Sequence, residues 1–183
     1  NQLEYDNYST KLKSYRSIPS DLKQVLEKIP KTTHPMDVLR TGCSMLGNLE
    51  PEGDFSKQNE TSDRILAALP SIITYWYRFS HDGVRVETAT DHETIGGQFL
   101  SLLTGKEPSE EHARALDISL ILYAEHGFNA STFTARICAS TLSDMHSCVA
   151  GAIGTLRGPL HGGANEEAMS MIEKFSSREE ANK

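Results

Sequence analysis

Apolar residues are spaced for helices almost everywhere along this chain of 183 residues. Leu66, Leu69, Ile72, Ile73 and Trp76, for instance, recur at intervals of mostly three and four residues, which places them on one face of a helix. No two alternating segments are joined by the Asn-Gly or Asp-Gly turn that marks a β-hairpin. The sequence therefore predicts an all-α fold.

Capping and turn residues divide the chain into separate helices. One long helix is predicted from about residue 61 to residue 79. Ser20 is expected to be the N-cap of a short helix, because its hydroxyl can accept a backbone N–H of the first turn. Thr90 and Glu93 have the spacing of a capping box and are expected to open another helix.

The composition is that of a globular protein with one core of ordinary size. Hydrophobic residues make up 38% of the chain and charged residues 23%, and the formal net charge is −7. An acidic chain without a basic patch offers no footprint for nucleic acid. The longest apolar run is far shorter than a membrane span, and no signal segment opens the chain. We therefore expect a cytoplasmic protein that binds neither nucleic acid nor membrane.

The cysteines and most of the histidines show no metal-binding pattern. Cys43, Cys138 and Cys148 form neither an even framework nor a Cys-x-x-Cys pair, so buried thiols are expected. Five histidines lack the spacing of metal ligands and are expected at the surface or as helix caps. They are His34, His81, His92, His112 and His146. The sequence thus predicts no metal site.

The most informative motif is Gly-Pro-Leu-His-Gly-Gly-Ala-Asn at residues 158–165. Pro159 fixes its own backbone, and the double glycine after His161 lets the chain approach another group closely. A helix is predicted from Ala164, so His161 would precede a helix N-terminus, whose positive end disfavours imidazolium. A neutral imidazole there can donate a hydrogen bond to a carbonyl oxygen that gains negative charge. A structural histidine in a glycine-rich turn is the alternative.

A second histidine lies at another predicted helix junction, in Ala-Glu-His-Gly-Phe-Asn-Ala-Ser-Thr at residues 124–132. His126, with Asn129 on the following turn, can donate hydrogen bonds to a keto acid that carries two carboxylates. A helix cap is the alternative for His126, since a helix C-terminus favours a cation. Two histidines at helix junctions together indicate a site.

These two motifs, in this order and at this separation, resemble those of citrate synthases. Residues 34–42, 75–77 and 95–100 are also similar to this family, and in particular to its bacterial 2-methylcitrate synthase branch. The resemblance implies that His161 stabilises the enol of an acyl thioester and that His126 contacts oxaloacetate. Asn129 is expected to bind substrate beside His126. Arg16 matches a family position that looks substrate-linked.

The family pattern continues beyond what this chain contains. Citrate synthases carry a later Gly-x-Gly-His-Pro segment with a second catalytic histidine, a catalytic aspartate and several arginines, and none of these follows Asn165. Residues 1–183 are therefore expected to be a partial large helical domain, with the small domain and the end of the large domain missing. Such a fragment is expected to be inactive alone.

The reaction implied by the resemblance joins propionyl-CoA to oxaloacetate and water, and releases 2-methylcitrate and CoA. The CoA thioester is then a co-substrate, its binding residues are unassigned, and no cofactor is expected to be permanently bound. The resemblance also implies a homodimer, to which the small-residue helices within residues 130–156 would contribute. Two alternatives stay open: a citrate synthase that uses acetyl-CoA, and a non-catalytic helical interaction module.

Overall fold

The computed structural model describes residues 1–124 and 127–181, apart from the side chains of Asn165 and Glu179. Within these residues it contains helices and no strand, which confirms the all-α prediction. The elements are α1 (Gln2–Ser14), α2 (Ser20–Glu27), α3 (Pro35–Leu49), the 3-10 turn η1 (Phe55–Lys57), α4 (Gln58–Asp82), α5 (Ile95–Thr104), α6 (Glu110–Tyr123), α7 (Ala130–Ser140), α8 (Met145–Leu156), α9 (Ala164–Ile172) and α10 (Arg178–Ala181).

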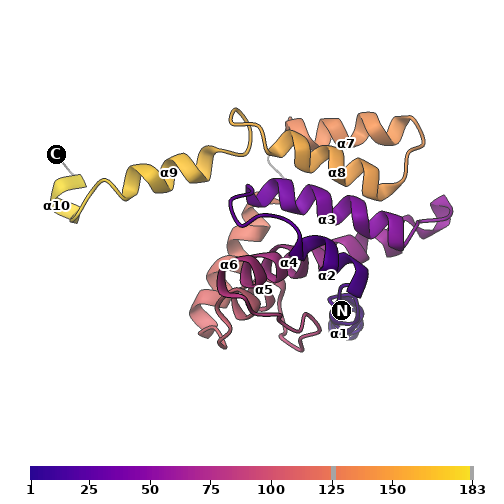
Figure 1. Ribbon diagram of the computed structural model, residues 1–183, viewed down its shortest axis with the longest axis horizontal. Coiled ribbons are helices and arrows are strands. Elements are labelled where there is room, and N and C mark those ends of the chain that lie inside the picture. The colour runs from indigo at the N-terminus through magenta and orange to yellow at the C-terminus, as the bar shows by residue number, and fades with distance from the viewer. Residues whose placement is uncertain (125–126, 182–183) are drawn as a thin grey trace.

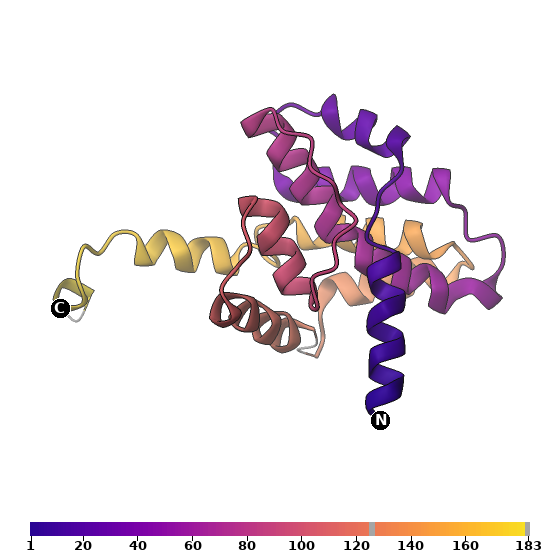
Figure 2. The same cartoon turned by 90° about the horizontal axis from the view of Figure 1, so that it is seen from below.

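The long helix α4 carries most of the core. It has 25 residues and extends beyond the predicted range of 61 to 79 at both ends. Ile72 and Trp76 of α4 are buried in one cluster with Leu22 and Leu26 of α2. The helices α2, α3 and α5 pack around α4 (Figures 1 and 2). Ile72 and Trp76 of the apolar stripe read from the sequence are therefore at the centre of the fold, whereas Leu66, at the start of that stripe, is exposed.

Two predicted helix caps are wrong. Helix α2 starts at Ser20 itself, and the N-cap is Pro19, whose extended backbone precedes the first turn. Helix α5 is capped by Thr94, which accepts from the backbone N–H of Gly97 at 3.0 Å. The carbonyl of Thr90 instead accepts from Arg16 at 2.9 Å, a contact across 74 residues that holds this segment in a non-helical conformation.

The helices α7 and α8 form a hairpin that lies on α3 (Figure 1). Cys43 of α3, Ile65 of α4 and Ile153 of α8 make a second buried cluster where these elements meet. Within the hairpin, the hydroxyl of Thr155 donates to that of Thr134 at 2.8 Å. The hairpin thus connects the start of α7 to the segment that leaves α8, and both of these carry residues of the predicted site.

The last two helices point away from the rest of the molecule (Figures 1 and 2). Met169, Met171 and Ile172 of α9 are exposed.

No helix in the described part of the chain combines the length and the apolar character needed to cross a lipid bilayer.

Candidate active site

His161 lies in a tight turn between α8 and α9. The carbonyl of Gly158 accepts from the backbone N–H of His161 at 3.0 Å and from that of Gly162 at 3.1 Å. A Cβ on Gly162 would lie 1.9 Å from the carbonyl oxygen of Leu156, so this close approach requires glycine. Helix α9 begins at Ala164, as predicted, and His161 therefore precedes its N-terminus.

The imidazole of His161 contacts the first turn of α7. Its Nε2 atom lies 3.0 Å from the hydroxyl oxygen of Ser131 and 3.2 Å from the backbone nitrogen of Ser131. Ser131 is nearly buried, and His161 is half-buried. The fold therefore brings together two motifs that are 30 residues apart in the sequence.

Asn129 holds this turn in place as the N-cap of α7. Its Oδ1 atom accepts from the backbone N–H groups of Ser131 at 2.9 Å and of Thr132 at 3.2 Å, and also from the Ser131 hydroxyl at 2.5 Å. Asn129, Ser131 and His161 thus form one connected cluster. Ser131 was not among the residues predicted for the site, although its place two residues after a capping asparagine is a local signal that its backbone N–H is bound by the cap.

The loop before α7 has an unusual backbone. Gly127 and Phe128 have φ values of 66° and 46°, and positive φ is uncommon outside glycine. Phe128 is fully exposed. The prediction made for His126 lies outside the described residues.

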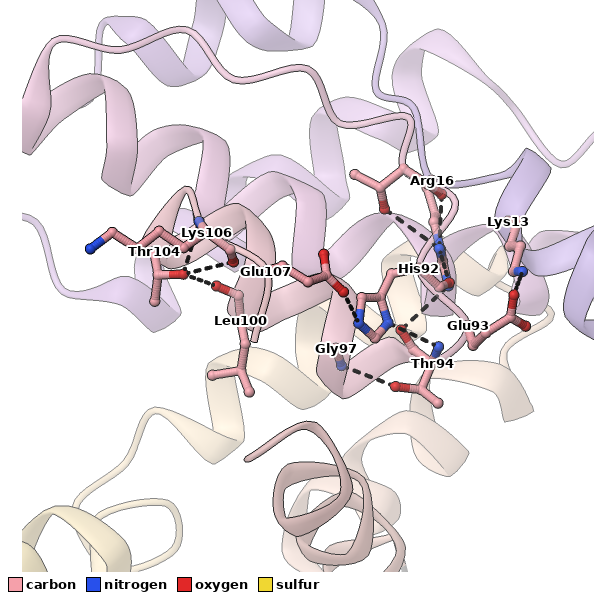
Figure 3. Close-up of polar contacts among 11 residues, drawn as sticks. Lys13, Arg16, His92, Glu93, Thr94, Gly97, Leu100, Thr104, Lys106 and Glu107 are labelled. Atoms are coloured by element: carbon pink, nitrogen blue, oxygen red, sulfur yellow. Dashed lines mark hydrogen bonds and ion pairs between the residues drawn. The ribbon is translucent and has the colours of Figure 1, made fainter. Parts of the chain in front are cut away.

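Arg16 is separate from this cluster in the described structure. It is 2% exposed, and its guanidinium donates to the carbonyls of Thr90, His92 and Thr94 (Figure 3). Burial lowers the pKa of this guanidinium, and the charges of Glu93 and Asp91 oppose that shift. Here Arg16 anchors residues 90–94 to the end of α1, and its predicted contact with substrate stays a prediction.

His146 differs from the prediction that it would be a surface or capping histidine. It is 3% exposed, and neither ring nitrogen makes a hydrogen bond in the described structure. The ring packs against Gly47 of α3, where an added Cβ would lie 2.7 Å from the Cβ of His146. His34, in contrast, caps α3 as predicted, since its Nδ1 accepts from the backbone N–H of Met36.

Cys43 and Cys148 are poor candidates for nucleophiles. Burial raises the pKa of Cys43 to about 12 and, together with a hydrogen bond that the Cys148 thiol donates to Cys138, raises that of Cys148 to about 11. Nucleophilic catalysis needs a thiolate near neutral pH. Among the described residues, no three His, Cys, Asp or Glu side chains are grouped so that they could hold a metal ion.

The whole chain, residues 1–183, matches the family described as "Citrate synthase, C-terminal domain". This chain belongs to the citrate synthase family. It is 67% identical over 174 residues to the 2-methylcitrate synthase of Shewanella oneidensis, an alignment that covers 95% of this chain and 46% of that protein. It is 42% identical to the citrate synthase of Deinococcus radiodurans, with 97% of this chain and 48% of that protein covered.

Solved citrate synthase structures have the same fold. That of the Thermotoga maritima enzyme matches with a TM-score of 0.78 at 32% identity, over 97% of this chain and 46% of that one. A Thermoplasma acidophilum citrate synthase, solved as a ternary complex with carboxymethyl coenzyme A and oxaloacetate, matches with a TM-score of 0.82 at 23% identity, over 94% and 45%. This chain spans about half the length of the relatives it matches.

Proposed function

We propose that the full-length protein is a 2-methylcitrate synthase, which condenses propionyl-CoA with oxaloacetate and water to give 2-methylcitrate and CoA. The 67% identity to such an enzyme supports this choice of substrate within the family. The contact between His161 and the first turn of α7 is the structural observation that carries the proposal, because it holds a histidine rigidly before a helix N-terminus. Residues 1–183 would be part of the large helical domain and inactive alone.

His161 would stabilise the enol of the acyl thioester. A backbone N–H can only donate, so the N–H of Ser131 favours a ring whose Nε2 is unprotonated. A neutral ring then carries its proton on Nδ1. That N–H can donate to the thioester oxygen as negative charge develops on it.

His126, Asn129 and Arg16 would bind oxaloacetate in this proposal. For Asn129, the cap uses Oδ1, so the amide group Nδ2 is the atom proposed to donate to a substrate carboxylate or keto oxygen. Arg16 would need to release at least one of its three backbone carbonyls to reach the substrate.

The acyl-CoA thioester would enter as a co-substrate, with no permanently bound cofactor. One methylene in an apolar pocket changes binding by only about 1 to 3 kcal/mol, so turnover of acetyl-CoA is expected as a slower reaction. Citrate synthase is therefore the second candidate, and the 42% identity to such an enzyme favours it.

We also propose a cytoplasmic homodimer that acts in propionate catabolism. Phe133 and Ile137 of α7 are 65% and 52% exposed on the hairpin face of this single chain, which is the kind of apolar surface that a second copy covers. The proposed interface therefore includes α7, within the small-residue region predicted from the sequence.

The test is an assay of CoA release by the full-length protein, with oxaloacetate and either propionyl-CoA or acetyl-CoA. A higher kcat/KM for propionyl-CoA is expected. A preference for acetyl-CoA would favour citrate synthase, and no CoA release with either substrate would favour a non-catalytic interaction module. Light scattering on the same sample tests the dimer.

A further inference from the structure

The hairpin of α7 and α8 carries one cysteine on each helix, Cys138 near the end of α7 and Cys148 near the start of α8 (Figure 1). The register of the two helices is given by Thr134 of α7. Its hydroxyl accepts from that of Thr155 at 2.8 Å, and its Cγ2 atom lies 3.7 Å from the place of a Cβ on Gly151. Thr134 therefore faces the stretch of α8 between residues 151 and 155.

The same register brings the two cysteines together. Cys138 follows Thr134 by four residues, about one helical turn, and the chain reverses its direction between α7 and α8. Cys138 therefore faces α8 one turn earlier, between residues 147 and 151, and Cys148 lies in that stretch. The thiol of Cys148 donates a hydrogen bond to Cys138, which agrees with this register. The carbonyl of Ser143, 3.8 Å from the sulfur of Cys148, is a second acceptor for the same proton.

The two thiols differ in their access to solvent. Both are free, but Cys138 is partly exposed whereas Cys148 is 4% exposed. Ile137, which is proposed for the dimer contact, points about 100° away from Cys138 around the helix axis, because successive helical residues are separated by that angle. A small oxidant can thus reach Cys138 from the surface while Cys148 is held beside it.

We propose that Cys138 and Cys148 form a reversible redox site, in which a peroxide converts the two thiols into a disulfide that joins α7 to α8. This site is additional to the proposed condensation and does not depend on it. Disulfides in a reducing compartment are usually transient and serve redox sensing, so the dithiol is the resting form.

The reaction has two steps. The sulfur of Cys138 attacks one oxygen of hydrogen peroxide as a thiolate, the O–O bond breaks, and the departing hydroxide leaves as water with the thiol proton, so that Cys138 becomes a sulfenic acid. The sulfur of Cys148 then attacks that of Cys138, the S–O bond breaks, and the hydroxide leaves as a second water with the proton of Cys148. The two sulfurs are oxidised, and one peroxide is reduced to two waters.

Cys148 is the resolving residue of this pair. Burial raises its pKa to about 11, so little of it is thiolate at neutral pH and the exposed Cys138 reacts with peroxide first. Its attack on Cys138 is intramolecular, and the contact between the two groups offsets the small thiolate fraction. The disulfide protects Cys138, because a sulfenic acid that is not resolved is oxidised further to sulfinic acid, which is not readily reversed.

The test is mass spectrometry of the full-length protein after treatment with hydrogen peroxide and alkylation of the remaining thiols. Trypsin cleaves after Arg136 and Arg157, so both cysteines fall in the peptide of residues 137–157. This peptide should carry no alkyl group and have lost two hydrogens, and dithiothreitol should restore both thiols. Two thiols that stay open to alkylation, or a link to a second peptide, would overturn the proposal.

Single variants test the two roles. In Cys148→Ser, Cys138 should stop at the sulfenic acid, which dimedone traps, and more peroxide should convert it to the sulfinic acid, a product that is scarce in the wild type. In Cys138→Ser, Cys148 should keep its thiol under the same exposure. Equal amounts of sulfinic acid at Cys138 in the wild type and Cys148→Ser would contradict the resolving role.

Cys43→Ser is the matched control. Cys43 is fully buried, and its thiol donates to the carbonyl of His146 at 3.7 Å. Its loss should leave the link between Cys138 and Cys148 unchanged. If the link failed to form in Cys43→Ser, the disulfide would not be a property of the pair, and the proposal would be wrong.

Discussion

Two histidines at opposite ends of α8 have opposite environments. His146, in the first turn, is buried against Gly47, and its ring nitrogens have no hydrogen-bond partner in the described structure. His161, just after the last turn, is half-buried and its Nε2 contacts Ser131. Burial alone therefore does not equip a histidine for the role proposed for His161. A usable imidazole needs polar groups that fix its orientation and protonation, together with access for a substrate.

The largest expected effect is on catalysis and comes from His161→Ala in the full-length protein. One preorganised donor to a developing oxyanion is typically worth about 3 to 4 kcal/mol, so kcat should fall by roughly two to three orders of magnitude. Steady-state kinetics measure this loss, and circular dichroism should show unchanged helix content. Near wild-type turnover would reduce His161 to a turn residue.

At the other end of α8, Gly47→Ala should destabilise the fold. The new Cβ would lie 2.7 Å from the Cβ of His146, so the α3–α8 contact must shift, at a cost of about 1 to 3 kcal/mol. This cost outweighs the helix propensity gained, which is at most about 1 kcal/mol. Urea unfolding measures the change. Gly151→Ala in α8 is the matched control, since its Cβ meets nothing closer than 3.7 Å and should be neutral or stabilising.

His146→Leu should remove a source of acid sensitivity. Burial lowers the pKa of His146, and Asp144, Glu50 and Glu52 only partly oppose this effect while Arg64 adds to it. Because the unfolded state takes up the proton more readily, the wild type should lose stability as the pH falls below the ordinary histidine pKa of about 6.5. The variant should be more stable by about 1 to 3 kcal/mol, since an unpaired buried polar ring is replaced.

Urea unfolding at pH 8 and pH 5 tests this prediction. The stability advantage of His146→Leu should be larger at pH 5. An advantage that is the same at both pH values would mean that His146 is already charged in the folded state or does not titrate in this range.

The smallest effect is expected for Asp37→Asn, close to the site but on the surface. Asp37 pairs with Arg157 at the end of α8 at 3.3 Å and with Arg40 at 3.1 Å, and all three side chains are partly exposed. Ion pairs on the surface contribute about 0 to 1 kcal/mol to the free energy of unfolding. Thermal unfolding and kcat should therefore change little, and a large loss of kcat would show that this pair holds the His161 turn.

Local chemistry in the sequence was enough to predict much of the fold. Helical spacing identified the elements because one apolar face is needed wherever a helix packs on a core. Ser109 caps the N-terminus of α6, and Gly105 ends α5 with a φ of 68°. Both ends follow from the type of a single residue, a serine that can cap and a glycine that tolerates positive φ. Family motifs pointed to His161 and to Asn129 for the same reason, because each motif is a short run of neighbouring residues.

Contacts between distant segments were decided by the tertiary structure. The N-cap of α5 is Thr94 and not the predicted Thr90. Arg16, more than 70 residues earlier in the sequence, donates to the carbonyls of Thr90 and His92 in the same segment. The packing of α8 on α3 buried His146, which has no local feature that distinguishes it from a surface histidine. The hairpin of α7 and α8 brought Ser131 to His161. The sequence by itself determined which segments are helical, because helix formation depends on neighbours three and four residues away. Only the packing of those helices decided which polar groups meet, because a hydrogen bond depends on the distance between two atoms in space.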